Sequence, residues 1–405
     1  MNRIQSNNIF FYILLFLINL IPISLLSGSL VTNIFHALIS VFFIFEIILK
    51  RKFYLFNDYF VYLLLFLWLT FIINLFFSSN YTSGLPRSIG FIRFILIILA
   101  IKYVLLYNNA KYLKIILFVW TLFFLLVAID LLIEFYSGSN IFGYKSNVPG
   151  RLASFLNDEL KIGAYFLAFG ILFICTFYKY VSKNFNYIII ISILILIISH
   201  LIGERSNFIK LSAIIILFLC FNYKQYLIKT TIILSISFFA IIFLSTFNEK
   251  LKYRYIDQLA SIEFKDNYYF KHYETSLSMF KENKLFGVGI KNFRNEIYNK
   301  KYFVENEEDS RHIITTHPHQ INFELLAETG LFGYLSFLIF SFLVIFKVIS
   351  SYIANKNILT LMPLLCFLVY INPILPSGSF FTTYSATIFW LNFSIMISFL
   401  KFRKK

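Results

Sequence analysis

The chain has 405 residues, of which 59% are hydrophobic and 14% charged, and its mean hydropathy is +0.76. This composition excludes a water-soluble domain, a disordered chain and a disulfide scaffold, and it is typical of a polytopic membrane protein. The net charge is +16, yet residues 248–330 hold 12 Lys/Arg and 13 Asp/Glu, which leaves 24 basic against 7 acidic residues elsewhere. Those basic residues predict contact with anionic membrane lipids and not with nucleic acid.

Twelve apolar runs approach the roughly 20 residues that a membrane-spanning helix needs. We therefore predict an all-α protein with about 12 transmembrane helices. The expected spans are 9–26, 30–48, 59–77, 88–107, 113–135, 163–181, 186–202, 208–222, 230–247, 331–350, 356–375 and 380–400. The first run has no small-residue cleavage site, so it is predicted to be an uncleaved span. Cys175, Cys220 and Cys366 lie within apolar runs and imply neither a disulfide nor a metal site.

Basic residues fall on alternate connections between these runs. They are Arg3, Lys50, Arg51, Lys52, Lys111, Lys114, Lys179, Lys183, Lys224, Lys229, Lys347, Lys356, Lys401, Arg403, Lys404 and Lys405. Cytoplasmic loops are enriched in Lys and Arg, so both termini are predicted to be cytoplasmic. The predicted organisation is helices 1–9 in residues 1–247, a large outer loop carrying the active site in 248–330, and helices 10–12 in 331–405.

Two shorter outer connections also carry basic residues. The connection at about 136–162 contains Arg151, and a tight turn reading Gly203-Glu204-Arg205-Ser206-Asn207 contains Arg205. An arginine in such a turn can be an interface anchor or a contact to an anionic ligand. We keep both interpretations at this point.

Within the large loop, the spacing of Phe270, Tyr273, Leu277 and Phe280 predicts an amphipathic helix over Tyr268 to Glu282. The helix is expected to end at Asn283, and Gly287-Val288-Gly289 is expected to form a turn. This glycine pair lacks the third glycine and the preceding strand of a dinucleotide-binding loop, so it is weak support for a phosphate site.

The segment Thr315-Thr316-His317-Pro318-His319-Gln320 precedes an apolar run that ends at Gly330. A threonine cap, a proline in the first turn and a final glycine predict a short helix with His319 in its first turn. There the helix dipole disfavours a second positive charge, so His319 is expected to be neutral and able to accept a proton from a hydroxyl. The alternative interpretation is a polar helix cap at the membrane edge.

At these residues the chain resembles the O-antigen ligase family of bacterial envelope glycosyltransferases. The resemblance rests on His319-Gln320 followed after nine residues by Gly330 and after two more by Gly333, on the turn around Arg205, and on the segment MFKENKLFGVGIKNFR from Met279 to Arg294. It implies a GT-C-like helical membrane fold with a large, mostly helical periplasmic loop, located in the bacterial inner membrane.

The resemblance also implies roles for individual residues. His319 would be the catalytic base and Arg205 a contact to the donor pyrophosphate. The family's second arginine is missing at the matching place, where Lys271 and His272 stand, so either these two or Arg254 would take its role. The supporting residues would be His317, Gln320, Glu328, Gly330 and Arg151, and His317 is the alternative base.

The implied reaction moves a glycan from undecaprenyl pyrophosphate to an acceptor hydroxyl, usually on lipid A–core, with inversion and with neither metal nor cofactor. An O-antigen polymerase and a protein O-oligosaccharyltransferase of the same family are alternatives. A polysaccharide or glycolipid transporter is an alternative from another class, for which Arg93 and Asp130 are the candidate intramembrane residues.

Overall fold

The computed structural model describes residues 8–107, 111–157, 159–260, 268–302 and 314–400. Within these ranges every regular element is a helix, so the prediction of an all-α fold is confirmed. The longer helices are α2 (Ile9–Asn19), α3 (Ile21–Leu26), α4 (Ser29–Lys50), α5 (Tyr59–Leu75), α6 (Tyr81–Gly90), α7 (Ile92–Tyr107), α8 (Lys111–Ser137), α9 (Ile162–Tyr180), α10 (Phe185–Leu201), α11 (Arg205–Asn222), α12 (Leu227–Ser245), α15 (Tyr268–Glu282), α17 (Ile321–Asn355), α18 (Ile358–Ile371) and α19 (Thr383–Ser398).

Short helical pieces lie in the connections. They are η1 (Phe53–Phe56), η2 (Ser154–Leu156), η3 (Lys224–Tyr226), α13 (Glu249–Lys252), η4 (Tyr253–Asp257), α14 (Gln258–Ala260), α16 (Phe293–Glu296) and η6 (Lys300–Tyr302). Among the described residues, seven helical segments are long and apolar enough to cross a membrane, and α6 with α7 is counted as one of them. Four further apolar helices are shorter. The chain is therefore a polytopic membrane protein.

Each predicted apolar run has a helical counterpart, but two boundaries differ. The run at 9–26 is broken at Leu20, because Pro22 lacks an N–H and is favoured in the first turn of the new helix α3, which begins at Ile21. The run expected at 331–350 belongs to the 35-residue helix α17, which starts ten residues earlier. The domain boundary drawn at residue 330 thus falls inside α17, at a break in its backbone.

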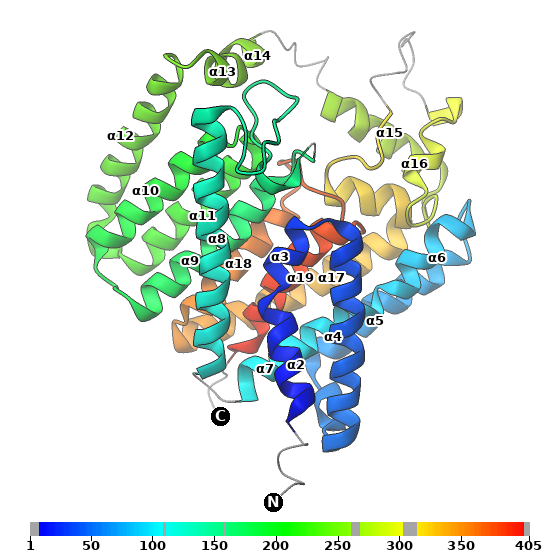
Figure 1. Cartoon of the computed structure of the whole chain (residues 1–405). Coiled ribbons are helices and arrows are strands. Elements are labelled where there is room, and N and C mark those ends of the chain that lie inside the picture. The colour runs from blue at the N-terminus through cyan, green and yellow to red at the C-terminus, as the bar shows by residue number, and fades with distance from the viewer. Residues whose placement is uncertain (1–7, 108–110, 158, 261–267, 303–313, 401–405) are drawn as a thin grey trace, which may run out of the picture.

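The helices form one bundle (Figure 1). The start of α2 lies at one end of the bundle, which we call the terminal end, and α13 to α16 lie at the other, which we call the loop end. At the centre, α19 is buried along almost its whole length and packs against α18, α7, α4 and α9. Its Trp390 is 1% exposed.

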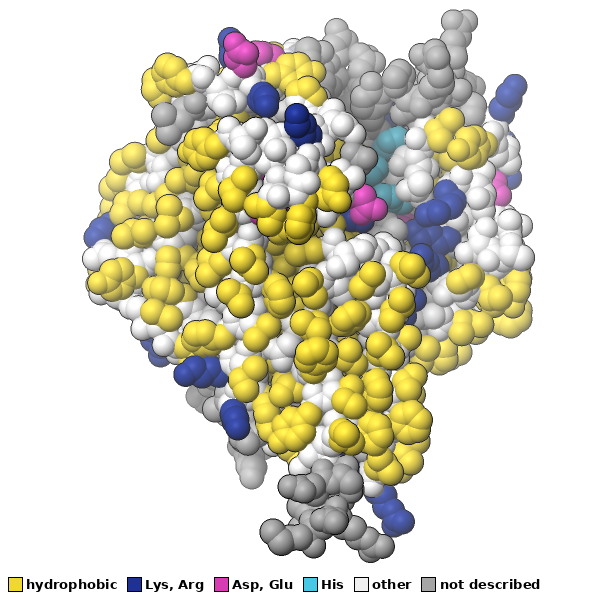
Figure 2. All heavy atoms as spheres, in the orientation of Figure 1, with side chains coloured by type: hydrophobic (Ala, Val, Ile, Leu, Met, Phe, Trp, Pro, Cys, Tyr) yellow, Lys and Arg dark blue, Asp and Glu magenta, His cyan; other side chains and the backbone are white. Residues whose placement is uncertain are grey.

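The sides of the bundle are apolar, as a surface in contact with lipid tails requires. Figure 2 shows hydrophobic side chains covering most of the visible side face. The outermost helix, α12, has the least buried span, and its Ile228 and Phe239 are 79% and 70% exposed.

The amphipathic helix α15 has the predicted bounds, but its apolar stripe is not its buried side. Phe270 and Leu277 are exposed, whereas the polar side chains of His272, Thr275 and Ser276 are buried. The reason is that α15 packs against the start of α17, where it meets histidines and other polar groups. α15 therefore turns a polar side toward the site.

Candidate active site at the loop end

His319 lies in the connection that leads into α17 and not inside the helix. Its φ of 56° is left-handed, which is uncommon for a residue other than glycine. The helix cap is Gln320, whose side-chain oxygen accepts hydrogen bonds from the N–H groups of Asn322 (2.5 Å) and Phe323 (3.1 Å). The predicted threonine cap, with Pro318 and His319 in the first turn, is thus wrong. The glutamine side chain reaches the first amides and moves the helix start to Ile321.

The imidazole of His319 lies among aromatic and polar side chains. Its Nε2 hydrogen bonds with Thr315 Oγ1 at 3.2 Å, and the ring centroids of His317, Tyr269 and His272 lie 4.2, 5.7 and 5.8 Å away. Burial lowers the pKa of His319 below its usual value. The ring is therefore mainly neutral near pH 7 and can accept a proton, although burial and not the helix dipole is the cause.

The connection between α18 and α19 fixes the backbone of His319. The N–H of Ser377 donates to the His319 carbonyl at 2.7 Å, and Ser377 Oγ accepts from the N–H of Ile321 at 3.0 Å. The Gln320 amide also donates to the carbonyl of Asn372 at 2.8 Å. Because the His319 carbonyl and the two residues that follow it are held by this connection, the left-handed backbone of His319 is maintained by contacts distant in sequence.

The same connection is attached to α17 by a buried carboxylate. Glu324, on the first turn of α17, accepts hydrogen bonds from the N–H of Phe380 at 2.7 Å and from the hydroxyl of Ser379. Ser379 Oγ in turn accepts from Lys291 Nζ at 3.2 Å. α17, the α18–α19 connection and the large loop thus meet directly behind His319.

Gly330 breaks α17 and lets a loop enter it. Its φ and ψ of 59° and −163° are outside the helical region, and a Cβ there would lie 2.5 Å from the carbonyl carbon of Leu285. The break frees backbone groups for pairing with the segment from Lys284 to Gly289. The N–H of Leu331 donates to the Lys284 carbonyl (2.8 Å), and the N–H of Val288 donates to the Ala327 carbonyl (2.9 Å). This backbone pairing explains structurally why position 330 is a glycine.

Glu328 is a structural clamp in this arrangement. It is fully buried, and its carboxylate accepts hydrogen bonds from the N–H groups of Lys291 (2.8 Å) and Phe293 (3.3 Å). From α5, Asn74 donates to the carbonyl of Phe286 at 2.5 Å and accepts from the N–H of Ile290 at 3.2 Å. The glycine turn at 287–289 is therefore locked between α17 and α5, and its N–H groups donate hydrogen bonds to carbonyls within the protein.

The structure brings together three arginines from segments far apart in sequence: Arg151, Arg205 and Arg254, which we call the arginine triad. Arg205 begins α11, and its guanidinium contacts the Arg254 carbonyl and Gln258 Oε1, both at 3.4 Å. Arg254 donates to the same Gln258 oxygen at 2.6 Å and to the Gly203 carbonyl at 2.9 Å. Burial, followed by the charges of Arg205 and Arg151, lowers the pKa of Arg254 to about 10, so it remains cationic near pH 7.

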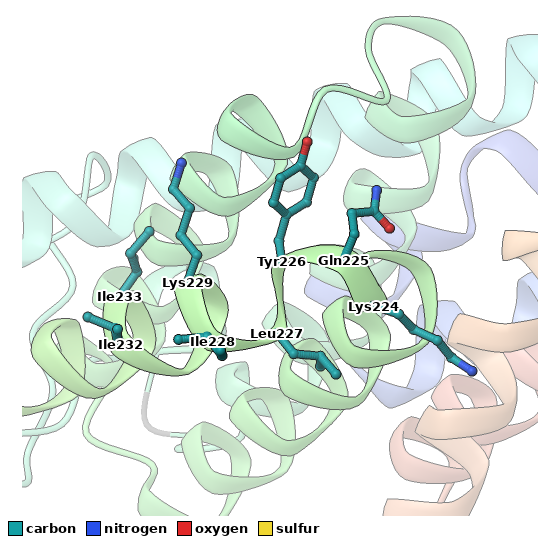
Figure 3. Close-up of a pocket in the computed structure, with 8 residues that line it drawn as sticks. All are labelled: Lys224, Gln225, Tyr226, Leu227, Ile228, Lys229, Ile232 and Ile233. Atoms are coloured by element: carbon teal, nitrogen blue, oxygen red, sulfur yellow. The ribbon is translucent and has the colours of Figure 1, made fainter.

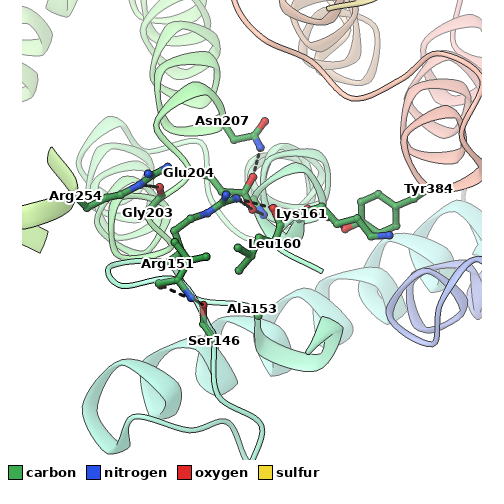
Figure 4. Close-up of polar contacts among 12 residues, drawn as sticks. Ser146, Arg151, Ala153, Leu160, Lys161, Gly203, Glu204, Asn207, Arg254 and Tyr384 are labelled. Atoms are coloured by element: carbon green, nitrogen blue, oxygen red, sulfur yellow. Dashed lines mark hydrogen bonds and ion pairs between the residues drawn. The ribbon is translucent and has the colours of Figure 1, made fainter. Parts of the chain in front are cut away.

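Arg151 joins the triad through the turn that carries Arg205 (Figure 4). Its guanidinium donates to the Leu160 carbonyl at 2.6 Å and lies 3.5 Å from the carboxylate of Glu204. A Cβ on Gly203 would overlap the backbone of Gly150, and a Cβ on Gly150 would overlap the backbone of Lys250 and the side chain of Arg254. Two outer connections are thus packed backbone to backbone beneath the arginines.

Asp130 and Glu134, near the end of α8, hold the connection that carries Arg151. Glu134 accepts from the N–H of Ser154 at 2.7 Å, and Asp130 accepts from the Ser154 hydroxyl at 2.5 Å and from the N–H of Ile141 at 2.9 Å. Asp130 is therefore bonded to a loop and does not line a pathway, which removes one of the two intramembrane residues considered for a transporter.

Tyr269 on α15 links the arginine triad to His319. Its ring contacts that of His319, and it lies within electrostatic reach of both Arg205 and Arg254. Sequence reasoning missed this residue because it lies outside the apolar stripe of α15. The spacing Tyr269 to His272 places both rings on one helix side, which is the signal that could have identified it.

The sequence left two options for the second cation beside Arg205, which were Arg254 or the pair Lys271 and His272. In the structure Arg254 is the one that lies beside Arg205. His272 lies beside His319 instead, and Lys271 is the neighbour of His272 on α15. The described residues therefore contain a neutral histidine and an arginine cluster that both approach Tyr269. A neutral base beside fixed positive charge suits a reaction in which a hydroxyl loses a proton and an anion leaves.

A separate groove of about 690 Å³ lies at the start of α12 (Figure 3). It is lined by Lys224, Gln225, Tyr226, Leu227, Ile228, Lys229, Ile232 and Ile233. The groove lies next to the C-terminal end of α11, whereas Arg205 lies at the N-terminal end of that helix. Most of its lining is apolar. Its chemistry is that of a membrane-facing helix junction with two lysines at its rim.

The fold and the site together define a polytopic helical membrane protein with a polar site at one end of its bundle. Residues 187–338 match the family model described as O-antigen ligase. This region is similar to the O-antigen ligase family, whose members are membrane glycosyltransferase-like ligases and polymerases. The match includes Arg205, Arg254 and His319. No curated protein matches the chain.

Proposed function

We propose that the protein transfers a glycan from an undecaprenyl-pyrophosphate donor to an acceptor hydroxyl, usually on lipid A–core, at the periplasmic face of a bacterial inner membrane. The observation that carries this proposal is the approach of a neutral His319 to the arginine triad through Tyr269, inside the region similar to the O-antigen ligase family. The start of α2 lies at the opposite end, and both termini would be cytoplasmic by the distribution of Lys and Arg.

In the proposed reaction the acceptor oxygen attacks the anomeric carbon of the donor sugar. A new glycosidic C–O bond forms, the C–O bond to the pyrophosphate breaks, and the hydroxyl proton passes to His319. Arg205 and Arg254 stabilise the negative charge that grows on the leaving pyrophosphate, and Arg151 adds to the local positive potential. Attack opposite the leaving group inverts the anomeric centre. The proposed reaction needs no metal, because the arginines supply the positive charge.

An O-antigen polymerase of the same family is the second candidate. It is favoured by the contribution of a second outer connection to the site, since Arg151 lies within the triad. In that case the acceptor would be another lipid-linked repeat. A protein acceptor is a further outcome of the experiment below.

The test uses a deletion strain restored with wild-type protein, His319→Ala or Arg205→Ala, with the amount of each protein in the membrane measured. Lipopolysaccharide gels are run beside extracts of undecaprenyl-linked glycan. A lost ladder with accumulated long lipid-linked glycan, restored only by wild type, supports the ligase. Single repeats that still reach lipid A–core indicate a polymerase. An unchanged ladder contradicts both the ligase and the polymerase. It would favour transfer to a protein acceptor, or a transporter.

A further inference from the structure

A second group of arginines lies at the loop end, apart from the triad: Arg87 on α6, Arg93 on α7 and Arg294 on α16. Arg87 and Arg93 lie on either side of the break between α6 and α7, and Arg294 is within electrostatic reach of Arg87. The described residues contain four ion pairs, and none of them involves these arginines. We call this group the second arginine cluster.

Neutral groups satisfy only part of its hydrogen-bonding capacity. Arg87 donates to the hydroxyl of Thr383 at 3.1 Å, and that hydroxyl donates onward to Asn33 at 3.0 Å. Arg93 Nε is buried and has no hydrogen-bond partner among the described residues, while its guanidinium lies 5.0 Å from the ring centroid of Phe94. Since a guanidinium carries five N–H donors, most of those in this cluster remain for a ligand.

Arg294 lies within electrostatic reach of the Glu324 carboxylate, whereas none of the four ion pairs of the described residues includes Arg87 or Arg93. Lys291 lies within electrostatic reach of Glu324 and Glu328, and Arg151 pairs with Glu204. Positive charges in helices near a membrane are costly unless they are compensated. A half-buried arginine pair without an acidic partner therefore points to compensation by an anionic ligand.

The position of the cluster favours a lipid over a soluble anion. Arg87 and Arg93 flank the break between α6 and α7, next to Ile89, which is 50% exposed. Leu30 at the start of α4 is also strongly exposed. Figure 2 shows Lys and Arg side chains gathered beside the histidines, with hydrophobic side chains directly beneath. Such a surface offers charge to a headgroup and apolar contacts to its acyl chains.

The cluster also lies next to the histidines. Burial, followed by the charges of His319, Lys291, Arg294 and His272, lowers the pKa of His317 well below its usual value. The charges that act on Arg205 and Arg254 come from the triad and from Tyr255 and Tyr269. The two arginine groups are therefore distinct. The triad approaches the histidines through Tyr269, and the second arginine cluster approaches them through Arg294.

We propose that Arg87, Arg93 and Arg294 form a second anion site that binds the phosphate-bearing headgroup of a membrane lipid, and that this lipid is the glycan acceptor. The triad would hold the donor pyrophosphate and the second cluster the acceptor phosphate. Two lipid substrates would thus be bound on separate basic surfaces with the histidines adjoining both. The acceptor role rests on the proposed function, whereas the phosphate site itself does not.

The test measures binding by the full chain in phosphatidylcholine vesicles. Bisphosphorylated lipid A, the same lipid without its phosphates, and inorganic phosphate are the three probes. We expect wild type to prefer the phosphorylated lipid by about tenfold or more, as charge-assisted hydrogen bonds would give. The double variant Arg87→Gln/Arg93→Gln should lose this preference, and Arg205→Gln should keep it. Inorganic phosphate should compete weakly.

The charge-retaining variant Arg87→Lys/Arg93→Lys, with its thermal unfolding measured, controls for misfolding and should bind with intermediate affinity. An undiminished preference in a folded glutamine variant overturns the proposal. Full competition by inorganic phosphate overturns its lipid part. Phosphate-dependent binding without any glycan transfer supports the site and contradicts the proposed function. If the glutamine variant binds and transfers normally while His319→Ala loses transfer, the second anion site is contradicted and the proposed function is not.

Discussion

The two ends of the bundle use carboxylates differently. At the terminal end, Glu46 pairs with Lys50 at 2.6 Å and accepts from the Tyr103 hydroxyl at 2.7 Å, and Asp58 pairs with Lys102 at 2.6 Å. At the loop end the carboxylates mainly accept from backbone amides of connecting segments. They are Glu134, Glu204, Glu324 and Glu328.

This difference explains how the loop end can be both rigid and positively charged. A carboxylate that accepts from backbone amides orders a loop without neutralising a nearby arginine. Arg205 and Arg254 consequently have no carboxylate partner among the described residues, and only Arg151 lies beside one. The terminal end instead balances its charges within side-chain pairs, which suits a region with a structural role. Five predictions test this contrast, from the largest expected effect to the smallest.

The largest effect is expected from His319→Ala. Loss of a general base typically reduces a rate by about 10²- to 10⁴-fold, and glycan transfer should fall within this range. His317→Ala is the matched control and should retain more activity, because His319 is the ring in contact with Tyr269. Transfer is measured with purified lipid-linked donor at equal protein levels. A greater loss in the His317 variant would identify that residue as the base.

Gly330→Ala should destabilise the whole loop end. The added Cβ would overlap the backbone of Leu285 and force an alanine into a left-handed conformation. Gly143→Ala is the control, since Gly143 has a φ of 81° but no atom within 4 Å of an added Cβ. We expect Gly330→Ala to cost about 1–3 kcal/mol more than the control. Thermal unfolding in detergent measures the difference, and equal losses would mean that the close backbone approach is unimportant.

Glu134→Gln and Glu46→Gln compare the two ends directly. Each should lose about 1–2 kcal/mol of stability, because a charged hydrogen-bond acceptor is replaced by a neutral one. Only Glu134→Gln should also raise the KM for the donor, since Glu134 orders the connection that carries Arg151. A donor KM raised equally by both variants would contradict the division of roles.

The pH dependence of transfer should reflect the lowered pKa of His319. The base is active when neutral, so the rate should stay level as the pH falls to about 6.5 and decline only below it. Stability should follow the same direction: a histidine with a lowered folded-state pKa contributes fully above the unfolded pKa, and this contribution is lost as the pH falls. A rate that already declines well above pH 6.5 would contradict a neutral buried His319.

Lys229→Gln should have the smallest effect. Lys229 lines the groove at the start of α12, at the end opposite Arg205, and contacts Asn186 at 3.3 Å. Its replacement should change neither transfer nor donor KM, and stability should stay within about 0.5 kcal/mol. Reduced transfer in this variant, measured beside wild type, would show that the terminal end takes part in the reaction.

Local patterns in the sequence predicted the helices well and the site only partly. The bounds of α15 followed from periodicity and the following Asn283, because both act over a few residues. Its buried side was misjudged because the neighbouring segments are polar, which periodicity cannot reveal. The threonine cap failed because Gln320 competes for the same amides. Arg151, Arg205 and Arg254 come together only through packing between distant segments, so no local pattern could join them.

The hydrogen bond from Ser377 to the His319 carbonyl has a consequence for biosynthesis. The backbone that holds His319 is completed only by the α18–α19 connection, long after α2 to α12 have been made. Asn74 likewise waits for partners 212 and 254 residues later in the chain. A nascent protein would therefore stay inactive in the membrane until its final helices are inserted, and truncation before α19 would leave a bundle without a formed site.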